Sequence, residues 1–162
     1  MRGCHLILRQ PLVQFIILFV FGGIMRITLE SDYALRIISV LAKSDDVSDA
    51  KTLAEKTSVT QRFALKILHK LVQGDMVTSY KGVRGGYKLK VSPEKITLKS
   101  VIELIDGPIA IVRCLDSGEG CSMNSDKTEC IYHHIFDKIS LELAAKLQNI
   151  TIADVLSNKY KL

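Results

Sequence analysis

Apolar residues recur every three or four positions along several stretches of this chain, a spacing that predicts amphipathic helices. The helices expected from this spacing cover residues 33–43, 49–56, 61–73, 98–105 and 131–148. Residue types that cap helix N-termini stand before them, namely Ser31 or Asp32, Ser48, Thr60 and Thr97. Gly74 and Gly107-Pro108 are expected to end two helices, and Thr151 to cap a last turn through Leu156. The chain is therefore expected to be mainly α-helical.

Two short runs with β-strand character interrupt this helical pattern. The runs, 76–80 and 87–91, flank the glycine-rich segment 81–86, and together they predict a β-hairpin. Two short helices followed directly by such a hairpin are typical of a winged helix-turn-helix. We expect a mainly α fold with a small β-hairpin wing, in which a winged helix-turn-helix domain is followed by a long C-terminal helix.

Positive charge is concentrated in the helix-turn-helix and the hairpin. The whole chain has a net charge of only +5, but between residues 56 and 90 a single acidic residue, Asp75, stands among many basic ones. The basic residues are Lys56, Arg62, Lys66, Lys70, Lys81, Arg84, Lys88 and Lys90. Such a patch attracts the phosphates of double-stranded DNA. The predicted DNA contacts are Thr60, Gln61, Arg62 and Lys66 on the third helix and Lys81 and Arg84 at the hairpin tip.

The N-terminal residues 1–24 form an apolar extension whose character differs from the rest. Its apolar run, 12–24, is shorter than the ~20 residues that a relaxed transmembrane helix needs. Arg2 and Arg9 precede the run as in a signal peptide, but no cleavage site with small residues follows. Since Met25 opens an ordinary start to a soluble domain, we expect residues 1–24 to be an artefact of start-site choice. A membrane anchor is the alternative.

Three cysteines lie in a segment rich in Gly, Ser and Asp. Such a segment offers no apolar surroundings in which a buried cysteine could pack. Cys114, Cys121 and Cys130 are spaced too widely for the usual zinc knuckles, and the C-x-x-C pattern of disulfide oxidoreductases is missing. Three thiols with His133 three residues after the last can hold an iron–sulfur cluster. Redox-active thiols are the alternative. Four cysteines in the whole chain do not indicate a secreted disulfide scaffold, so we expect a reducing cytoplasm.

The last long helix carries an apolar stripe that is larger than one small domain needs to dock a terminal helix. The stripe consists of Ile131, Ile135, Ile139, Leu143 and Leu147. We expect this stripe to pair with a second copy of the chain. The predicted organisation is then a DNA-binding domain at 25–107, a cysteine loop at 108–134, and a dimerisation helix with C-terminal tail at 135–162.

Short motifs along residues 25–156 form an ordered set. In the first half they are Met25-Arg26-Ile27-Thr28, Ser31-Asp32-Tyr33-Ala34-Leu35-Arg36, Leu53-Ala54-Glu55, Phe63-Ala64-Leu65-Lys66-Ile67-Leu68 and Lys70-Leu71. In the second half they are Gly85-Gly86-Tyr87-Lys88-Leu89, Ile96-Thr97-Leu98, Val101-Ile102-Glu103, Gly107-Pro108, Cys114-Leu115 and Ile150-Thr151-Ile152-Ala153-Asp154. With the two later cysteines, this set resembles the winged-helix regulators of the IscR and NsrR type, the Rrf-two family.

The resemblance implies a homodimer joined by the long helix, with a [2Fe–2S] or [4Fe–4S] cluster on Cys114, Cys121 and Cys130. It implies a fourth ligand as well, either His133 or an acidic residue from the partner subunit at the position of Asp32. The gaps between the cysteines are longer here than in the best-known members. Family members also often carry Glu-Gln where Leu65-Lys66 stand in this chain.

We therefore expect a transcriptional regulator, a repressor, whose binding to a palindromic operator depends on the state of a cluster sensing iron–sulfur supply, iron, nitric oxide or redox state. A cluster-free thiol regulator on the same fold is one alternative, and a small iron–sulfur redox protein is another. The chain is not expected to be an enzyme, because it has no second cofactor motif, no nucleophile–base pair and no phosphate loop. We do not expect a membrane partner.

Overall fold

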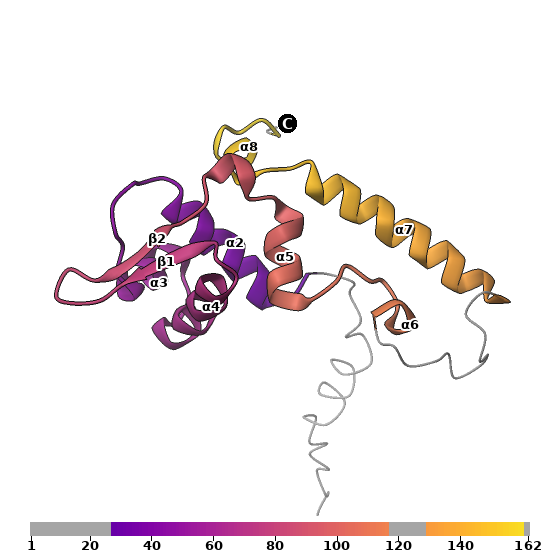
Figure 1. Cartoon of the computed structure of the whole chain (residues 1–162), viewed down its shortest axis with the longest axis horizontal. Helices are drawn as coiled ribbons and strands as arrows, with labels where there is room; N and C mark the ends of the chain where they lie inside the picture. Colours follow the sequence, from indigo (N-terminus) through magenta and orange to yellow (C-terminus); the bar gives the residue numbers. More distant parts are fainter. Residues whose placement is uncertain (1–26, 117–128, 161–162) are drawn as a thin grey trace, which may run out of the picture.

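The computed structural model describes residues 27–116 and 129–160 (Figure 1). The expected N-terminal extension and Cys121 lie outside these ranges. The elements are α2 (Leu29–Leu41), α3 (Ala50–Thr57), α4 (Gln61–Gln73), β1 (Val77–Tyr80), β2 (Gly86–Leu89), the 3₁₀ turn η1 (Pro93–Lys95), α5 (Leu98–Asp106), α6 (Arg113–Asp116), α7 (Ile131–Gln148) and α8 (Ile152–Leu156). The expected fold class, mainly helical with one antiparallel hairpin, is confirmed.

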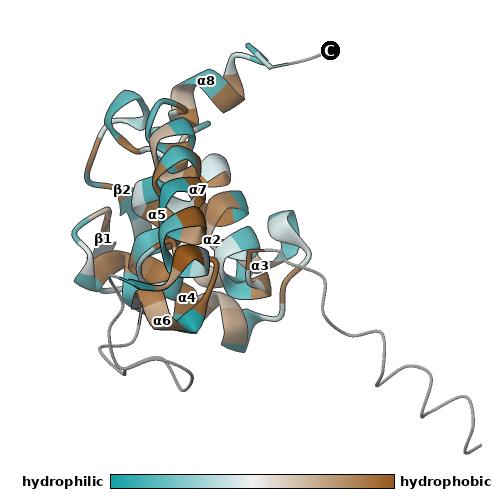
Figure 2. Cartoon of the chain, turned by 90° about the vertical axis from the view of Figure 1, so that its right-hand side faces the viewer, coloured by the Kyte–Doolittle hydropathy of each residue, from teal (hydrophilic) through white to brown (hydrophobic). Residues whose placement is uncertain are grey.

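One hydrophobic core joins α2, α3, α4 and α5, and the hydropathy colouring of Figure 2 shows apolar faces on these helices. The largest side chains with almost no exposed surface are Ile37, Ile38, Leu53, Ile67, Leu68, Leu71, Ile96, Ile152, Val77 and Val101. Those on α2, α3, α4 and α5 stand at helical spacing in the sequence, so each of these helices turns one apolar face inward. Complete burial of one such side chain stabilises the fold by ~1.5–3 kcal/mol. This core fixes α4 against the rest of the domain.

Two of the expected helix caps are wrong. α2 begins earlier than predicted, because the Thr28 hydroxyl accepts a hydrogen bond from the Ser31 backbone N–H at 3.2 Å. α3 is capped by Asp49, whose carboxylate accepts from the backbone N–H of Lys51 at 2.9 Å. Ser48 is not the cap because its backbone pairs with Tyr87 in a β-bridge. The caps at Thr60, Thr97 and Thr151 stand where the sequence predicted them.

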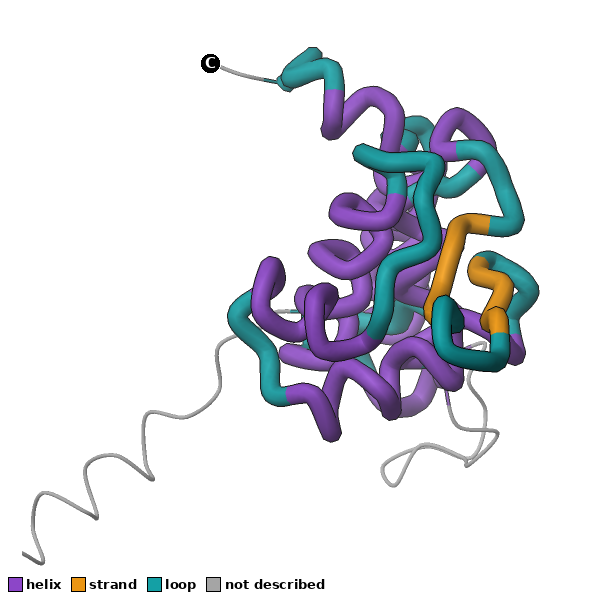
Figure 3. Tube along the Cα trace, turned by 90° about the vertical axis from the view of Figure 1, so that its left-hand side faces the viewer, coloured by secondary structure: helices purple, strands orange, loops and turns teal. Residues whose placement is uncertain are grey.

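The wing is held to the helical domain along its base. β1 and β2 pair antiparallel, with Val77 opposite Leu89 and Tyr80 opposite Gly86, at one edge of the helices (Figure 3). The Ser48 and Tyr87 backbones exchange hydrogen bonds of 3.0 and 2.8 Å. A β-carbon on Gly86 would collide with the Ser48 carbonyl, so this close approach requires glycine.

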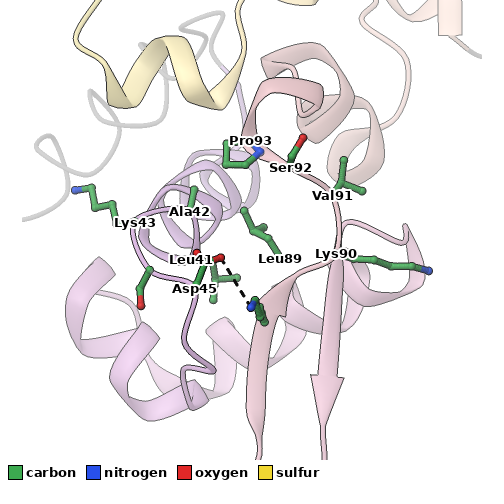
Figure 4. Close-up of a pocket in the computed structure, with 11 residues that line it drawn as sticks. Leu41, Ala42, Lys43, Asp45, Leu89, Lys90, Val91, Ser92 and Pro93 are labelled. Atoms are coloured by element: carbon green, nitrogen blue, oxygen red, sulfur yellow. Dashed lines mark ion pairs between the residues drawn. The ribbon is translucent and has the colours of Figure 1, made fainter.

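A pocket of about 350 Å³ lies beside this junction, between the end of α2 and β2 (Figure 4). Its lining mixes aliphatic and polar side chains, with Leu41, Leu89 and Lys90 among the residues drawn in Figure 4. One ion pair crosses it, between Lys88 Nζ and Asp45 Oδ1 at 3.8 Å. This ion pair joins the α2–α3 connection to β2, as the neighbouring backbone bridge between Ser48 and Tyr87 does.

The chain returns to the helical domain after α7. The Leu98 N–H donates to the Ile150 carbonyl, and the Ile152 N–H donates to the Ile96 carbonyl, each at 2.9 Å. These two bonds tie the C-terminal end of α7 to the start of α5. None of the helices in the described ranges combines the length and apolar character that crossing a bilayer requires.

The segment expected to be a cysteine loop is not entirely a loop. Residues Arg113–Asp116 form α6, so Cys114 stands on a short helix. Cys130 is the N-cap residue of α7, and that helix covers Ile131–Gln148 as predicted. The 3₁₀ turn η1 was not expected from the sequence either.

Candidate DNA-binding surface and cysteine site

The start of α4 presents the first group of predicted DNA contacts. Ser58 takes a left-handed conformation, with φ of 58°, which turns the chain sharply between α3 and α4. Thr60 then begins α4 without forming a side-chain cap hydrogen bond. Thr60, Gln61 and Arg62 are all exposed. The first turn of α4 therefore offers these polar side chains to a ligand on the surface.

Lys66, also predicted to contact DNA, already has a partner within the protein. Its Nζ lies 2.9 Å from Glu30 Oε2, and Lys70 Nζ lies 2.9 Å from Glu30 Oε1. Burial opposes ionisation of the Glu30 carboxyl, but hydrogen bonds from Lys70 and Lys66 more than offset it and lower the pKa of Glu30. Sequence reasoning missed Glu30, because the two charges are far apart in the chain and no local spacing connects them.

The wing tip carries the second group of predicted DNA contacts. Lys81 and Arg84 are exposed there and flank the fully exposed Val83. Gly82 has a φ of 105°, and its carbonyl accepts a hydrogen bond from the Gly85 N–H at 2.9 Å. The tight turn places both cations at the end of the hairpin, away from the core.

The cysteine site brings two of its predicted members together. Cys114 Sγ lies 3.7 Å from His133 Nδ1, although the residues are 19 positions apart. Cys130 stands one turn before His133, at the start of the same helix. Cys121 falls outside the described residues. Within the described ranges no group of three metal-binding side chains is assembled.

Ser140, which sequence reasoning missed, positions the segment that carries Cys114. Its hydroxyl oxygen accepts a hydrogen bond from the Ile111 N–H at 3.2 Å and donates to the Phe136 carbonyl at 2.8 Å. Ser140 is buried, whereas the other side chains of α7 are exposed or half-buried. The bond attaches the chain just before α6 to the middle of α7, and so brings Cys114 toward His133.

Asp32, the alternative fourth ligand, forms an ion pair on its own helix. Its Oδ2 lies 2.6 Å from Arg36 Nη2 one turn further along α2. The sequence also offered Asp32 as the N-cap of α2, but Thr28 caps that helix. The contact between Cys114 and His133 does not involve Asp32.

The donors present fit a metal or cluster site. Two donors on one tetrahedral metal ion, a sulfur at ~2.3 Å and a nitrogen at ~2.0 Å, lie roughly 3.5 Å apart. The 3.7 Å between Cys114 Sγ and His133 Nδ1 is close to that separation. Thiolate and imidazole are also the donor types that iron–sulfur clusters accept.

Comparisons with known proteins find transcriptional regulators of similar sequence and fold. NsrR of Bacillus subtilis, an HTH-type transcriptional regulator, is 28% identical over 137 residues, which are 83% of this chain and 92% of that relative. The structure of CymR, described as the global cysteine regulator of B. subtilis, aligns with a TM-score of 0.63 and 23% identity, covering 86% of this chain and 100% of CymR. T. potens IscR aligns with a TM-score of 0.64 and 18% identity, covering 88% and 94%.

The family model that describes Rrf2 as an iron-dependent transcriptional regulator matches residues 27–158. That match spans the helix-turn-helix, the wing, the cysteine segment, α7 and α8. It covers most of the chain and includes every element described above. The relatives are transcriptional regulators rather than enzymes, as the sequence predicted. The chain therefore belongs to the Rrf2 family of winged helix-turn-helix, DNA-binding transcriptional regulators.

Proposed function

We propose that this regulator binds a palindromic operator as a homodimer, as a repressor, and that an iron–sulfur cluster controls its binding. The observation that carries the proposal is the 3.7 Å contact between Cys114 Sγ and His133 Nδ1. It pairs a thiol and an imidazole at the edge of the segment that also contains Cys121 and Cys130. The family description, iron-dependent transcriptional regulator, supports the same reading.

In this proposal Cys114, Cys121 and Cys130 hold the cluster, either [2Fe–2S] or [4Fe–4S], with His133 as fourth ligand. Asp32 of the partner subunit is the alternative. When bound, the cluster supplies a centre whose loss or change of state reports iron–sulfur supply, iron, nitric oxide or redox state. The reducing cytoplasm, where thiols stay available as ligands, is the proposed compartment.

The protein's own part is to connect that site with α7. Cys114 stands on α6, while Cys130 and His133 stand at the start of α7. A group held by residues from both helices fixes the distance between them. The Ile111–Ser140 hydrogen bond already joins the same two parts of the chain. Ligation would therefore select one placement of α7 relative to the DNA-binding domain.

The homodimer is proposed to form through α7. Ile131, Ile135, Ile139 and Leu143 are exposed along one side of this helix. Exposed apolar side chains at i, i+4 spacing are the pattern that pairs helices in an oligomer. Two chains joined in this way present two copies of α4, as a palindromic operator requires.

DNA is proposed to be contacted at base edges and phosphates by Thr60, Gln61, Arg62 and Lys66 of α4 in the major groove, with Lys81 and Arg84 of the wing in the neighbouring groove. All six side chains are exposed. Because Leu65-Lys66 differ from the Glu-Gln common in the family, this operator is expected to differ from those of better-known members.

A second candidate function, a cluster-free thiol regulator, rests on the same cysteines. Oxidants convert accessible cysteine thiols to sulfenic acids and disulfides, so a regulator can read redox state without a metal.

The deciding experiment is anaerobic purification followed by an absorption spectrum and counts of iron and sulfide. Operator selection is then carried out on the loaded and the stripped protein. A coloured protein with iron, sulfide and state-dependent DNA binding supports the proposal. A colourless, iron-free protein with normal operator binding favours the thiol regulator.

The fourth ligand is assigned with two variants and one matched control. His133→Ala is expected to alter the absorption and stability of the cluster, while His134→Ala on the same helix leaves both unchanged. If Asp32→Ala destroys the cluster and His133→Ala does not, Asp32 of the partner subunit is the ligand instead.

A further inference from the structure

The carboxylate of Glu30 joins the N-terminal turn of α2 to two lysines of α4. Glu30 Oε2 binds Lys66 and Oε1 binds Lys70, each at 2.9 Å. Only 17% of the Glu30 side chain is exposed. One acid therefore compensates two cations on the helix proposed to read DNA.

The two lysines differ in how firmly the protein holds them. Lys70 is 32% exposed, and its ammonium also donates to the Ile105 carbonyl at 3.1 Å. Lys66 is 57% exposed, with its ammonium 5.7 Å from the centre of the Phe63 ring. Lys70 thus belongs to the packing between helices, whereas an anion from solvent can reach the Lys66 ammonium.

A DNA phosphate and the Glu30 carboxylate offer Lys66 the same interaction, a charge-assisted hydrogen bond. If Lys66 moves to a phosphate, Glu30 keeps its ion pair with Lys70, so the charge of the partly buried carboxylate stays compensated. The exchange therefore leaves no unpaired buried charge. The attraction between Glu30 and Lys66 nevertheless has to be given up, so Glu30 opposes the transfer of Lys66 to a phosphate.

We propose that Glu30 is a positioning residue that limits the affinity of α4 for DNA by competing with a phosphate for Lys66. The inference rests on the proposed role of α4 in DNA binding. Since phosphates carry no sequence information, the effect acts on all DNA sequences alike.

The test compares full-length wild type and Glu30→Gln on a fluorescent duplex of random sequence over a range of KCl concentrations. Glu30→Gln is expected to bind roughly two- to fivefold more tightly, the size of one exposed ion pair. The slope of log affinity against log salt should steepen by about one unit, as one more phosphate contact predicts. Glu94→Gln, an exposed acid on η1 and away from the proposed dimer helix, is the matched control and should change neither quantity.

A double-mutant cycle shows whether Glu30 acts through Lys66. In a Lys66→Gln background, Glu30→Gln should no longer tighten binding. Equal tightening in both backgrounds would mean a general charge effect and would overturn the proposal, as would unchanged or weaker binding by Glu30→Gln alone. Should Glu30→Gln fail to fold by circular dichroism, Glu30→Ala replaces it. Its side chain carries no charge, so it cannot compete for Lys66, and the same tightening is expected.

Arg62→Gln separates this inference from the proposed function. If Arg62→Gln weakens binding but Glu30→Gln changes nothing, α4 reads DNA and only the role of Glu30 is wrong. If both leave binding unchanged, the proposed DNA-binding surface itself is wrong.

Discussion

The side chain of Leu104, on α5, occupies the space that a β-carbon on Gly74 would need. Gly74 follows α4 with a φ of −82°, which any residue can adopt, while the left-handed conformation falls on Asp75 at 60°. The sequence placed the end of α4 correctly, but the reason for glycine is close packing of α5 rather than backbone freedom.

Gly74→Ala is therefore expected to destabilise the protein by ~1–3 kcal/mol, the usual cost of overpacking. Urea unfolding followed by circular dichroism measures this free energy. Combining the change with Leu104→Ala should give less than the sum of the two separate losses, because the new methyl group fills space that Leu104 leaves. Strict additivity of the two losses would contradict the packing explanation.

The cations at the wing tip should contribute affinity without selectivity. Lys81→Gln is expected to weaken binding to all DNA sequences alike and to reduce the salt slope by about one unit. Fluorescence anisotropy on an operator and on a random duplex, each at several salt concentrations, measures both effects. Lys95→Gln on η1 is the control. A loss confined to the operator would identify Lys81 as a base-reading residue instead.

The apolar side of α7 should determine the oligomeric state. Ile139→Lys places a charge in the middle of the exposed stripe and is expected to convert the dimer to a monomer, as measured by light scattering after size exclusion. Leu141→Lys introduces the same charge at an exposed position on the other side of the helix and should leave the dimer intact. Dissociation by both variants, or by Leu141→Lys alone, would place the interface elsewhere.

Acid should remove part of the stability of the C-terminal turn. Hydrogen bonds from Lys159, and from the backbone and hydroxyl of Thr151, lower the pKa of Asp154 from 3.8 to about 2. Because the folded-state value lies below the unfolded one, the ionised carboxylate stabilises the fold above about pH 4. That contribution is lost as the pH falls toward about 2.

Asp154→Asn should consequently lower the thermal unfolding midpoint at pH 7, and the difference from wild type should shrink below about pH 4. Circular dichroism melts at a series of pH values measure that difference. Asp137→Asn, at an exposed carboxylate on α7, serves as the control. A difference that stays constant with pH would show that Asp154 acts through the shape of its side chain and not through its charge.

Local signals predicted the helices of this protein well. The bounds of α4 and α7 match the predicted ranges because each combines a sustained apolar period with polar or glycine residues at its ends. The caps of α2 and α3 were misplaced because neighbouring residues of equal capping ability, such as Ser48 and Asp49, compete. A tertiary contact, the bridge from Ser48 to Tyr87, decided between those two.

The candidate site was predictable in its residue types but not in its connections. The thiols and His133 stood out because a polar, glycine-rich segment gives cysteine nothing to pack against. The bond from Ile111 to Ser140 and the bridge from Glu30 to Lys66 join residues 29 and 36 positions apart. Contacts of that kind depend on how the helices pack, which the spacing of residues along the chain does not encode.

The two backbone bonds after α7 determine how that helix can move. They hold its C-terminal end to the start of α5, whereas Cys130 and His133 stand at the opposite end. A helix of 18 residues is about 27 Å long, so the cysteine end lies at the tip of a long arm. A shift at that tip would turn α7 about the Leu98–Ile150 junction and, through the Ser140–Ile111 bond, move the segment before α6 with it. Such a rotation would tilt the two halves of a dimer against each other and alter the spacing of their DNA-reading helices.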